Sequence, residues 1–220
     1  MRPGYKQTEV GVIPADWEVA KLGDHATFRT GPFGSALHKS DYVYGGVPII
    51  NPMQIVDGKL IPTPRMTITE DAAQRLSEFR LCAGEVVIGR RGDMGRCAVI
   101  EPSANGWLCG TGCLKISLSP AVVSPEYSFY YLSQKQVVEY IEGQAVGATL
   151  LNLSASIVEG FEIKLLPLSI QRRIADVLGQ YDALIENYQR QIGLLEAMAQ
   201  NLYHEWFVRG RCPYAEMRAD

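Results

Sequence analysis

The sequence lacks several features that would assign it to common classes of protein. No stretch approaches the roughly 18 apolar residues without charge that a membrane-spanning helix needs. The five cysteines include no CxxC pair, so neither a disulfide framework nor paired zinc-ligand spacing is indicated. An excess of positive charge is also missing, because the formal net charge is −3. Binding of a polyanion by bulk charge alone is therefore excluded.

Metal-ligand spacing is equally sparse. Cys109 and Cys113 are close enough to provide two zinc ligands, but no second pair follows them. The histidines at positions 25, 38 and 204 are not spaced as metal ligands, and none has a nearby nucleophile. We therefore expect reduced structural cysteines and no metal site.

Motifs for self-contained catalysis are missing as well. The sequence has no GxxxxGK[ST] phosphate loop and no GxSxG nucleophile elbow. The tetrad 51–54, Asn-Pro-Met-Gln, superficially resembles that of amino-methyltransferases, but lacks the aromatic fourth residue that would stack on a flipped base. We expect no catalytic residue and no cofactor bound by this chain.

The hydrophobic pattern predicts an α+β domain over residues 1–166. Residues 1–16 are interpreted as an arm without the apolar core of a signal peptide, so a cytoplasmic protein is expected. Helices are expected to begin at Thr69 and at Ser124, the second ending at Gly143. The predicted strands, in chain order, are 17–22, 25–30, 47–51, 85–90, 96–101, one or two within 107–118, and 161–165.

The most informative feature is a long amphipathic helix, which the pattern predicts from Ser169 to Arg209. It lies within a segment 167–210, and Ser169 is the candidate for its N-terminal cap. Gly210 and Pro213 end it, and residues 211–220 form a tail. About 39 helical residues span roughly 58 Å, whereas a domain of this size is only about 30–40 Å across. Its main apolar positions are Ile174, Val177, Tyr181, Leu184, Tyr188, Leu195, Met198 and Leu202. Such a stripe needs another helix or another chain to cover it.

The best predicted hairpin joins 85–90 to 96–101 through a turn that contains two glycines. Arg90, Arg91 and Arg96 lie on or beside its tip. A β-ribbon fits the major groove of DNA, and arginine pairs bidentately with guanine. A solvated tip in which Asp93 balances one arginine fits the residues equally well.

A second candidate surface is the Gly- and Ser-rich loop that follows residue 30. Ser35, Lys39 and Tyr42 supply a hydroxyl, a cation and an aromatic ring, which suit phosphates and base edges. A plain polar loop is the alternative. Gln54 is a weaker candidate, as a contact to adenine.

Five segments occur in an order that resembles a known family. They are EVGVIPADWEVAKLGD, GPFGSALHKSDYVYGGVPIINPMQI, LCAGEVVIGRRGDMGRCAVI, VGATLLNLSASIVEGFEIKLLPLSIQRRIADVL and IENYQRQIGLLEAMAQNLYHEWFV. Together they resemble one half of the DNA specificity subunit of type I restriction–modification systems, with one target recognition domain and one long helix instead of two of each. One departure is the junction 167–171, which keeps a single proline and the glutamine of the usual double-proline phrase.

The resemblance implies DNA binding without catalysis. It implies a homodimer that reads a bipartite, two-fold symmetric site in double-stranded DNA. It also implies docking of adenine methyltransferase subunits, which carry S-adenosylmethionine, and of a restriction subunit. Base-reading residues vary within the family, so none is transferred by the resemblance.

Two alternatives also fit the sequence. One is an assembly or regulatory protein that pairs with a full-length specificity subunit. The other is a recognition domain detached from a single-chain restriction–methylation enzyme.

Overall fold

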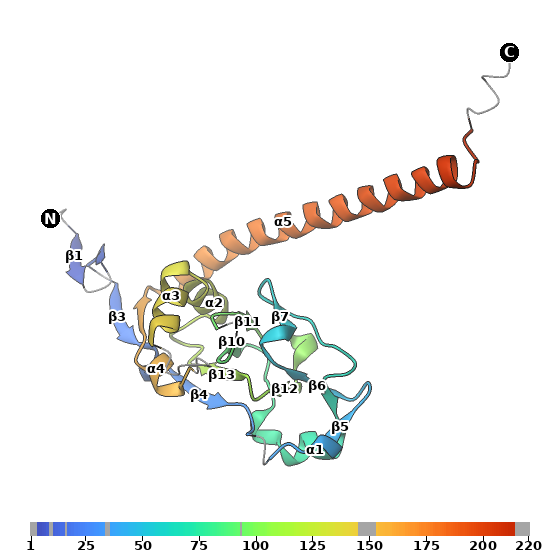
Figure 1. Cartoon of the computed structure of the whole chain (residues 1–220). Coiled ribbons are helices and arrows are strands. Elements are labelled where there is room, and N and C mark those ends of the chain that lie inside the picture. The colour runs from blue at the N-terminus through green and yellow to red at the C-terminus, as the bar shows by residue number, and fades with distance from the viewer. Residues whose placement is uncertain are drawn as a thin grey trace. The chain divides into compact units, whose positions relative to one another are not determined.

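The computed structural model describes residues 4–8, 11–15, 17–33, 36–92, 94–144 and 153–213. The chain divides into two compact units, Met1–Ala175 and Asp176–Asp220. The first unit is a mixed α/β domain, and the second continues the long helix (Figure 1). The α+β class and the long C-terminal helix predicted from the sequence are confirmed.

A four-stranded antiparallel sheet forms the centre of the first unit. In the order β11-β10-β13-β4, its strands are Cys97–Val99, Val86–Gly89, Cys113–Leu118 and Ala26–Thr30. All of β10 is buried, because both faces of the sheet are covered. The predicted hairpin is confirmed, with Val87 opposite Ala98. Its turn contains Gly92 and Gly95 at φ of 72° and 87°, which few other residues adopt.

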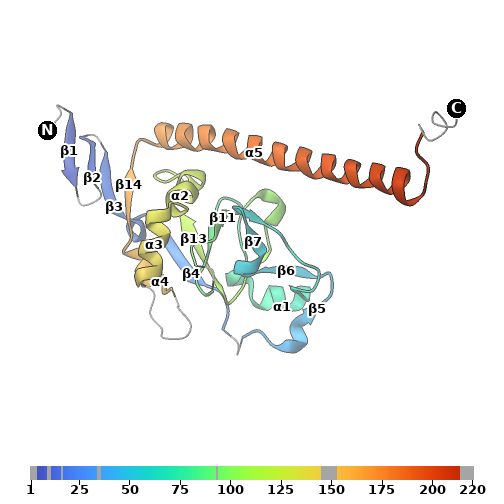
Figure 2. The same cartoon turned by 45° about the horizontal axis from the view of Figure 1, so that its top comes forward.

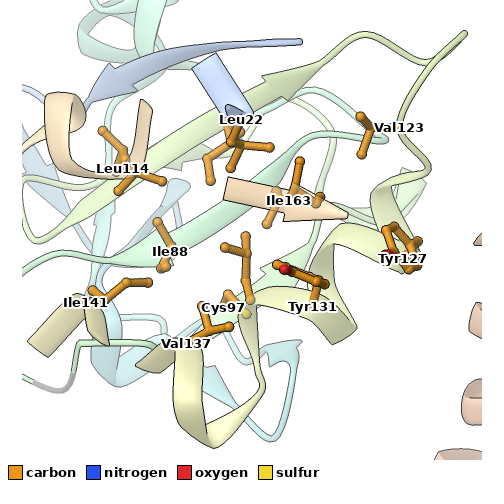
Figure 3. Close-up of a cluster of buried hydrophobic side chains, with 14 of the residues drawn as sticks. Leu22, Ile88, Cys97, Leu114, Val123, Tyr127, Tyr131, Val137, Ile141 and Ile163 are labelled. Carbon is orange, nitrogen blue, oxygen red and sulfur yellow. The ribbon is translucent and has the colours of Figure 1, made fainter. Parts of the chain in front are cut away.

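Short helices cover one face of this sheet. Figure 3 shows Ile88, Leu114 and Cys97 from the sheet packed near Tyr131 and Ile141 from the helices. The covering helices are α2 (Pro125–Leu132), α3 (Lys135–Gln144) and α4 (Ala155–Glu159).

The single helix predicted over 124–142 is instead two helices, α2 and α3. The start is confirmed, since the Ser124 hydroxyl accepts a hydrogen bond from the Tyr127 amide. The break falls at Ser133, whose hydroxyl donates to the Phe129 carbonyl at 2.7 Å. The expected stop at Gly143 is wrong, because α3 runs through it to Gln144.

The other face of the central sheet carries a second sheet and a second core cluster. Thr69 caps α1 (Glu70–Arg75) as predicted, by accepting a hydrogen bond from the Ala72 amide. The second sheet, on this other face, has the strand order β12-β6-β9-β5. Its strands are Leu108–Cys109, Val47–Ile50, Thr67–Ile68 and Tyr42–Val43, and a separate hairpin joins β7 (Ile55–Val56) to β8 (Lys59–Leu60).

Two further strand pairs complete the first unit (Figure 2). β3 (Glu18–Lys21) pairs antiparallel with β14 (Glu162–Leu165), so the beginning and the end of the globular part lie side by side. The expected N-terminal arm contains a hairpin of β1 (Tyr5–Thr8) and β2 (Gly11–Pro14).

The long helix α5 spans Leu168–Tyr203 and continues into a π-helical turn, His204–Val208. The predicted cap at Ser169 is wrong, because Ser169 lies inside the first turn. The Pro167 carbonyl instead accepts from the amides of Ile170 and Gln171. Gly210, at φ of +65°, follows the helix as predicted.

The start of α5 is tied to the first unit by Gln171, whose side chain is fully buried. Its carbonyl oxygen accepts the Ser124 amide at 2.9 Å. Its amide nitrogen donates to the carbonyls of Val122 and Leu166, both at 2.8 Å. These bonds satisfy the groups at the start of α2 and at the end of β14 simultaneously.

Arg90 is also buried, with a relative exposure of 5%. Its guanidinium donates to the carbonyls of Leu153 and Thr111 at 3.3 and 3.4 Å, and lies 5.7 Å from the centre of the Phe33 ring. Burial lowers the pKa of Arg90, and the nearby charge of Arg91 lowers it further. Arg90 therefore connects the end of β10 to three loops.

Replacing Gln171 with Leu should lower the free energy of unfolding by roughly 2–4 kcal/mol, because three backbone groups lose their partner in a buried site. Urea denaturation followed by circular dichroism measures this change. Gln200→Leu, at an exposed position of the same helix, is the control and should shift stability by less than about 0.5 kcal/mol. Equal effects of the two substitutions would show that the buried amide contributes nothing specific.

Arg90→Met should cost roughly 1–3 kcal/mol of stability, because the Leu153 and Thr111 carbonyls lose their donor. The exposed neighbour provides the matched variant, Arg91→Met, which should change stability by less than about 0.5 kcal/mol. The two midpoints of unfolding in urea are compared. A midpoint for Arg90→Met equal to that of the unsubstituted protein would contradict a structural role for this guanidinium.

Candidate nucleic-acid interface

The hairpin between β10 and β11 separates its three arginines. Arg91 and Arg96 are exposed, whereas Arg90 points into the protein. Arg96 donates to the Ile55 carbonyl at 3.2 Å and so links the hairpin to β7. Asp93 lies outside the described residues. Two of the three arginines are therefore placed where a ligand could reach them, and contact between Arg90 and DNA stays a prediction that this burial does not favour.

The loop after β4 presents Lys39 and Tyr42, while Ser35 lies outside the described residues. Lys39 is exposed in a 3-10 turn, Lys39–Asp41. Asp41 accepts from the His38 amide at 2.8 Å and from Arg75 at 2.7 Å, and these contacts lower its pKa. Burial, reinforced by the charge of Asp41, raises the pKa of Tyr42. The Tyr42 hydroxyl therefore stays protonated and can donate a hydrogen bond.

Gln54 is buried, with 6% exposure, and its side chain serves the fold. Its carbonyl oxygen accepts the Asn51 amide at 3.2 Å, which closes a capping box around the 3-10 turn Pro52–Gln54. The Asn51 side chain accepts in turn from the Gly112 amide at 3.1 Å. The tetrad 51–54 is thus a rigid turn, and the adenine contact expected of Gln54 stays an untested prediction.

The three buried cysteines of the first unit are poor ligands for a metal. Burial raises the pKa of Cys97 to about 11 and that of Cys109 to about 12, and it raises the pKa of Cys113 well above its usual range. Metal binding requires the thiolate. Among the residues that the structure describes, no group of three or more His, Cys, Asp or Glu side chains could hold a metal ion. No described helix is long and apolar enough to cross a membrane.

The apolar stripe of α5 is open to solvent in this chain. Tyr181 and Leu195 are each 63% exposed, and Leu184 is 46% exposed. The exception among the predicted positions is Ile174, which is partly buried against the core of the first unit. The other exposed members of the predicted set are Val177, Tyr188, Met198 and Leu202.

Two exposed side chains of the first unit escaped the sequence analysis. Tyr44 is 78% exposed, twice as much as Tyr42, and Arg65 is exposed in a neighbouring turn. The only sequence signal for Tyr44 is the Gly45-Gly46 pair after it, which marks a turn.

Curated proteins that resemble this chain are specificity subunits. The type I restriction enzyme MjaIX specificity subunit of Methanocaldococcus jannaschii is 31% identical over 206 residues, which cover 93% of this chain and 46% of that protein. The HindI specificity subunit of Haemophilus influenzae is 21% identical and matches 88% of this chain and 41% of its own length. The chain therefore spans about half the length of the curated relatives it matches.

Solved structures share the fold. The S subunit of a type I restriction–modification system from M. genitalium gives a TM-score of 0.63 at 19% identity, covering 94% of this chain and 49% of that one. The HsdS subunit from Thermoanaerobacter tengcongensis gives 0.61 at 19% identity, with coverages of 95% and 49%.

The family model of the type I restriction modification DNA specificity domain matches residues 14–197. This range contains both four-stranded sheets of the first unit, the helices α1 to α4 and most of α5. The chain belongs to the type I restriction–modification DNA specificity family.

Proposed function

We propose that this chain is a non-catalytic DNA-specificity component of a type I restriction–modification system. The first unit contacts double-stranded DNA, and α5 holds two such units together. The observation that carries the proposal is the combination of a family-specific recognition domain with a long helix whose apolar stripe is exposed.

The occupant of the apolar stripe is a second copy of this chain. Half of the length of the related subunits is present, so two copies supply two recognition domains and two helices. A two-fold axis across the helices makes them antiparallel and makes the interface self-complementary. Such a dimer reads a bipartite site whose two halves are related by the same symmetry.

Catalysis is assigned to partner subunits. The adenine methyltransferase subunits, which bind S-adenosylmethionine, dock on the helices, and a restriction subunit joins that complex. A net charge of −3 supports this division, because the partners then supply much of the positive charge that holds the duplex.

Within the first unit, the proposed DNA contacts are the exposed members of the predicted set. Arg91 and Arg96 lie at the hairpin, and Lys39 and Tyr42 follow β4. Arginine donates to guanine or phosphate, and the protonated tyrosine donates to phosphate. The buried side chains of Arg90 and Gln54 support these surfaces from within.

The purified chain should be a dimer at micromolar concentration, because isolated chains leave the stripe in contact with water. Light scattering coupled to size-exclusion chromatography should give twice the chain mass of 24.3 kDa. Tyr181→Asp combined with Leu195→Asp should give monomers, since each copy would bury two carboxylates. Gln200→Asp, at an exposed position outside the predicted stripe, should remain dimeric. A stable monomer of the unsubstituted chain would remove the dimer from the proposal.

Arg91→Ala combined with Arg96→Ala should relax or weaken the choice of methylation site, by roughly 1–3 kcal/mol for each lost bidentate contact. The variant is expressed with its methyltransferase subunits, and adenine methylation is mapped across the host genome. Lys135→Ala removes an exposed cation from α3 and serves as the control. An unchanged methylated sequence in the double variant would exclude the hairpin from DNA recognition.

A further inference from the structure

The most exposed aromatic side chain of the first unit is displayed on a turn between β5 and β6. Tyr44 is 78% exposed, and the following residue, Gly45, has a φ of +76°. The Gly45 amide donates to the Pro64 carbonyl at 2.9 Å, which places this turn beside the turn that contains Arg65. An aromatic ring and a guanidinium are thus offered by two adjacent loops.

Both loops contact the hydroxyl of Thr67, a buried residue that is 3% exposed. Its hydroxyl oxygen accepts the Gly46 amide at 3.0 Å and lies within hydrogen-bonding distance of the carbonyls of Val43 and Pro64. Gly46 also packs closely, because a Cβ atom there would meet the Ile68 carbonyl at 2.2 Å. The exposed side chains therefore stand on a backbone that loses little entropy when it binds a ligand.

The charge around this pair favours a polyanion. From Tyr42 to Thr69 the sequence contains a single acidic residue, Asp57, against Lys59 and Arg65, and the acids that follow, Glu70 and Asp71, lie in the first turn of α1, where Glu70 pairs with Arg80. The nearest upstream carboxylate, Asp41, is held by Arg75. Arg65 makes no hydrogen bond or ion pair with any residue that the structure describes. Its charge is thus not neutralised by a described neighbour.

We propose that Tyr44 and Arg65 contact the sugar–phosphate backbone of the bound duplex. The Arg65 guanidinium pairs with a phosphate, and the Tyr44 hydroxyl donates to a phosphate of the same strand while its ring covers the adjoining sugar. The inference rests on the proposed function and adds to it a contact surface outside the hairpin. Within this segment Tyr44 is better placed than Tyr42, which belongs to β5 and is half as exposed.

The test uses the full chain in complex with its methyltransferase subunits and a fluorescein-labelled 40-base-pair duplex of random sequence, with binding followed by anisotropy over a series of salt concentrations. Arg65→Gln should weaken binding about 5- to 10-fold and reduce the salt slope by about one ion. Tyr44→Phe should weaken binding about 3-fold and leave the salt slope unchanged, because it removes a neutral hydroxyl.

Matched controls are Lys135→Gln and Tyr140→Phe, both exposed on α3, which should bind like the unsubstituted chain. If the complex that contains the unsubstituted chain fails to bind the duplex, the proposed function falls and this inference falls with it. If that complex binds and both test variants match their controls, only the inference is overturned. Loss of methyltransferase binding with unchanged duplex binding would assign this surface to a protein partner, and would also overturn it.

Discussion

The apolar stripe of α5 is exposed in the single chain, and contact of so much apolar surface with water is unfavourable. A helix of 36 residues extends roughly 54 Å, and only its first turns bury side chains against the α/β unit. In the proposed dimer, association removes the remaining apolar surface from water. In the proposed dimer the same helix sets the distance between two reading units, so a single hydrophobic pattern would specify both the assembly and the separation of two half-sites.

The α/β unit holds its polar loops on a rigid support. Its central sheet is covered on both faces, so the hairpin and the neighbouring turns are attached to fully packed strands. Buried polar side chains then fix the loops individually. Gln171 fixes the start of α5, Arg90 fixes the loops beside the hairpin, and Thr67 fixes the turn of Tyr44. Each is buried and hydrogen-bonded, so each carries a high cost of removal.

Arg90 also illustrates what the sequence could and could not predict. Periodicity and turn signals were sufficient for the hairpin of β10 and β11, the cap of α1 and the long helix, because those patterns are local. The direction of Arg90 was not predictable, since it depends on the carbonyls of Thr111 and Leu153, which are distant in the chain. The break between α2 and α3 at Ser133 was not predictable either, because no glycine or proline marks it in the sequence.

The distribution of charge reconciles an acidic chain with the proposed anionic ligand. The net charge is −3, yet residues 25–96 carry nine basic and seven acidic residues. Several of these acids are already engaged, including Asp41 with Arg75, Glu70 with Arg80 and Glu85 with Lys115. Each such pair cancels one acid and one base within the fold, while Arg65 and Lys39 remain exposed at the surface. The local arrangement of charged side chains, and not the net charge of the chain, therefore decides how strongly this part of the surface attracts a phosphate backbone.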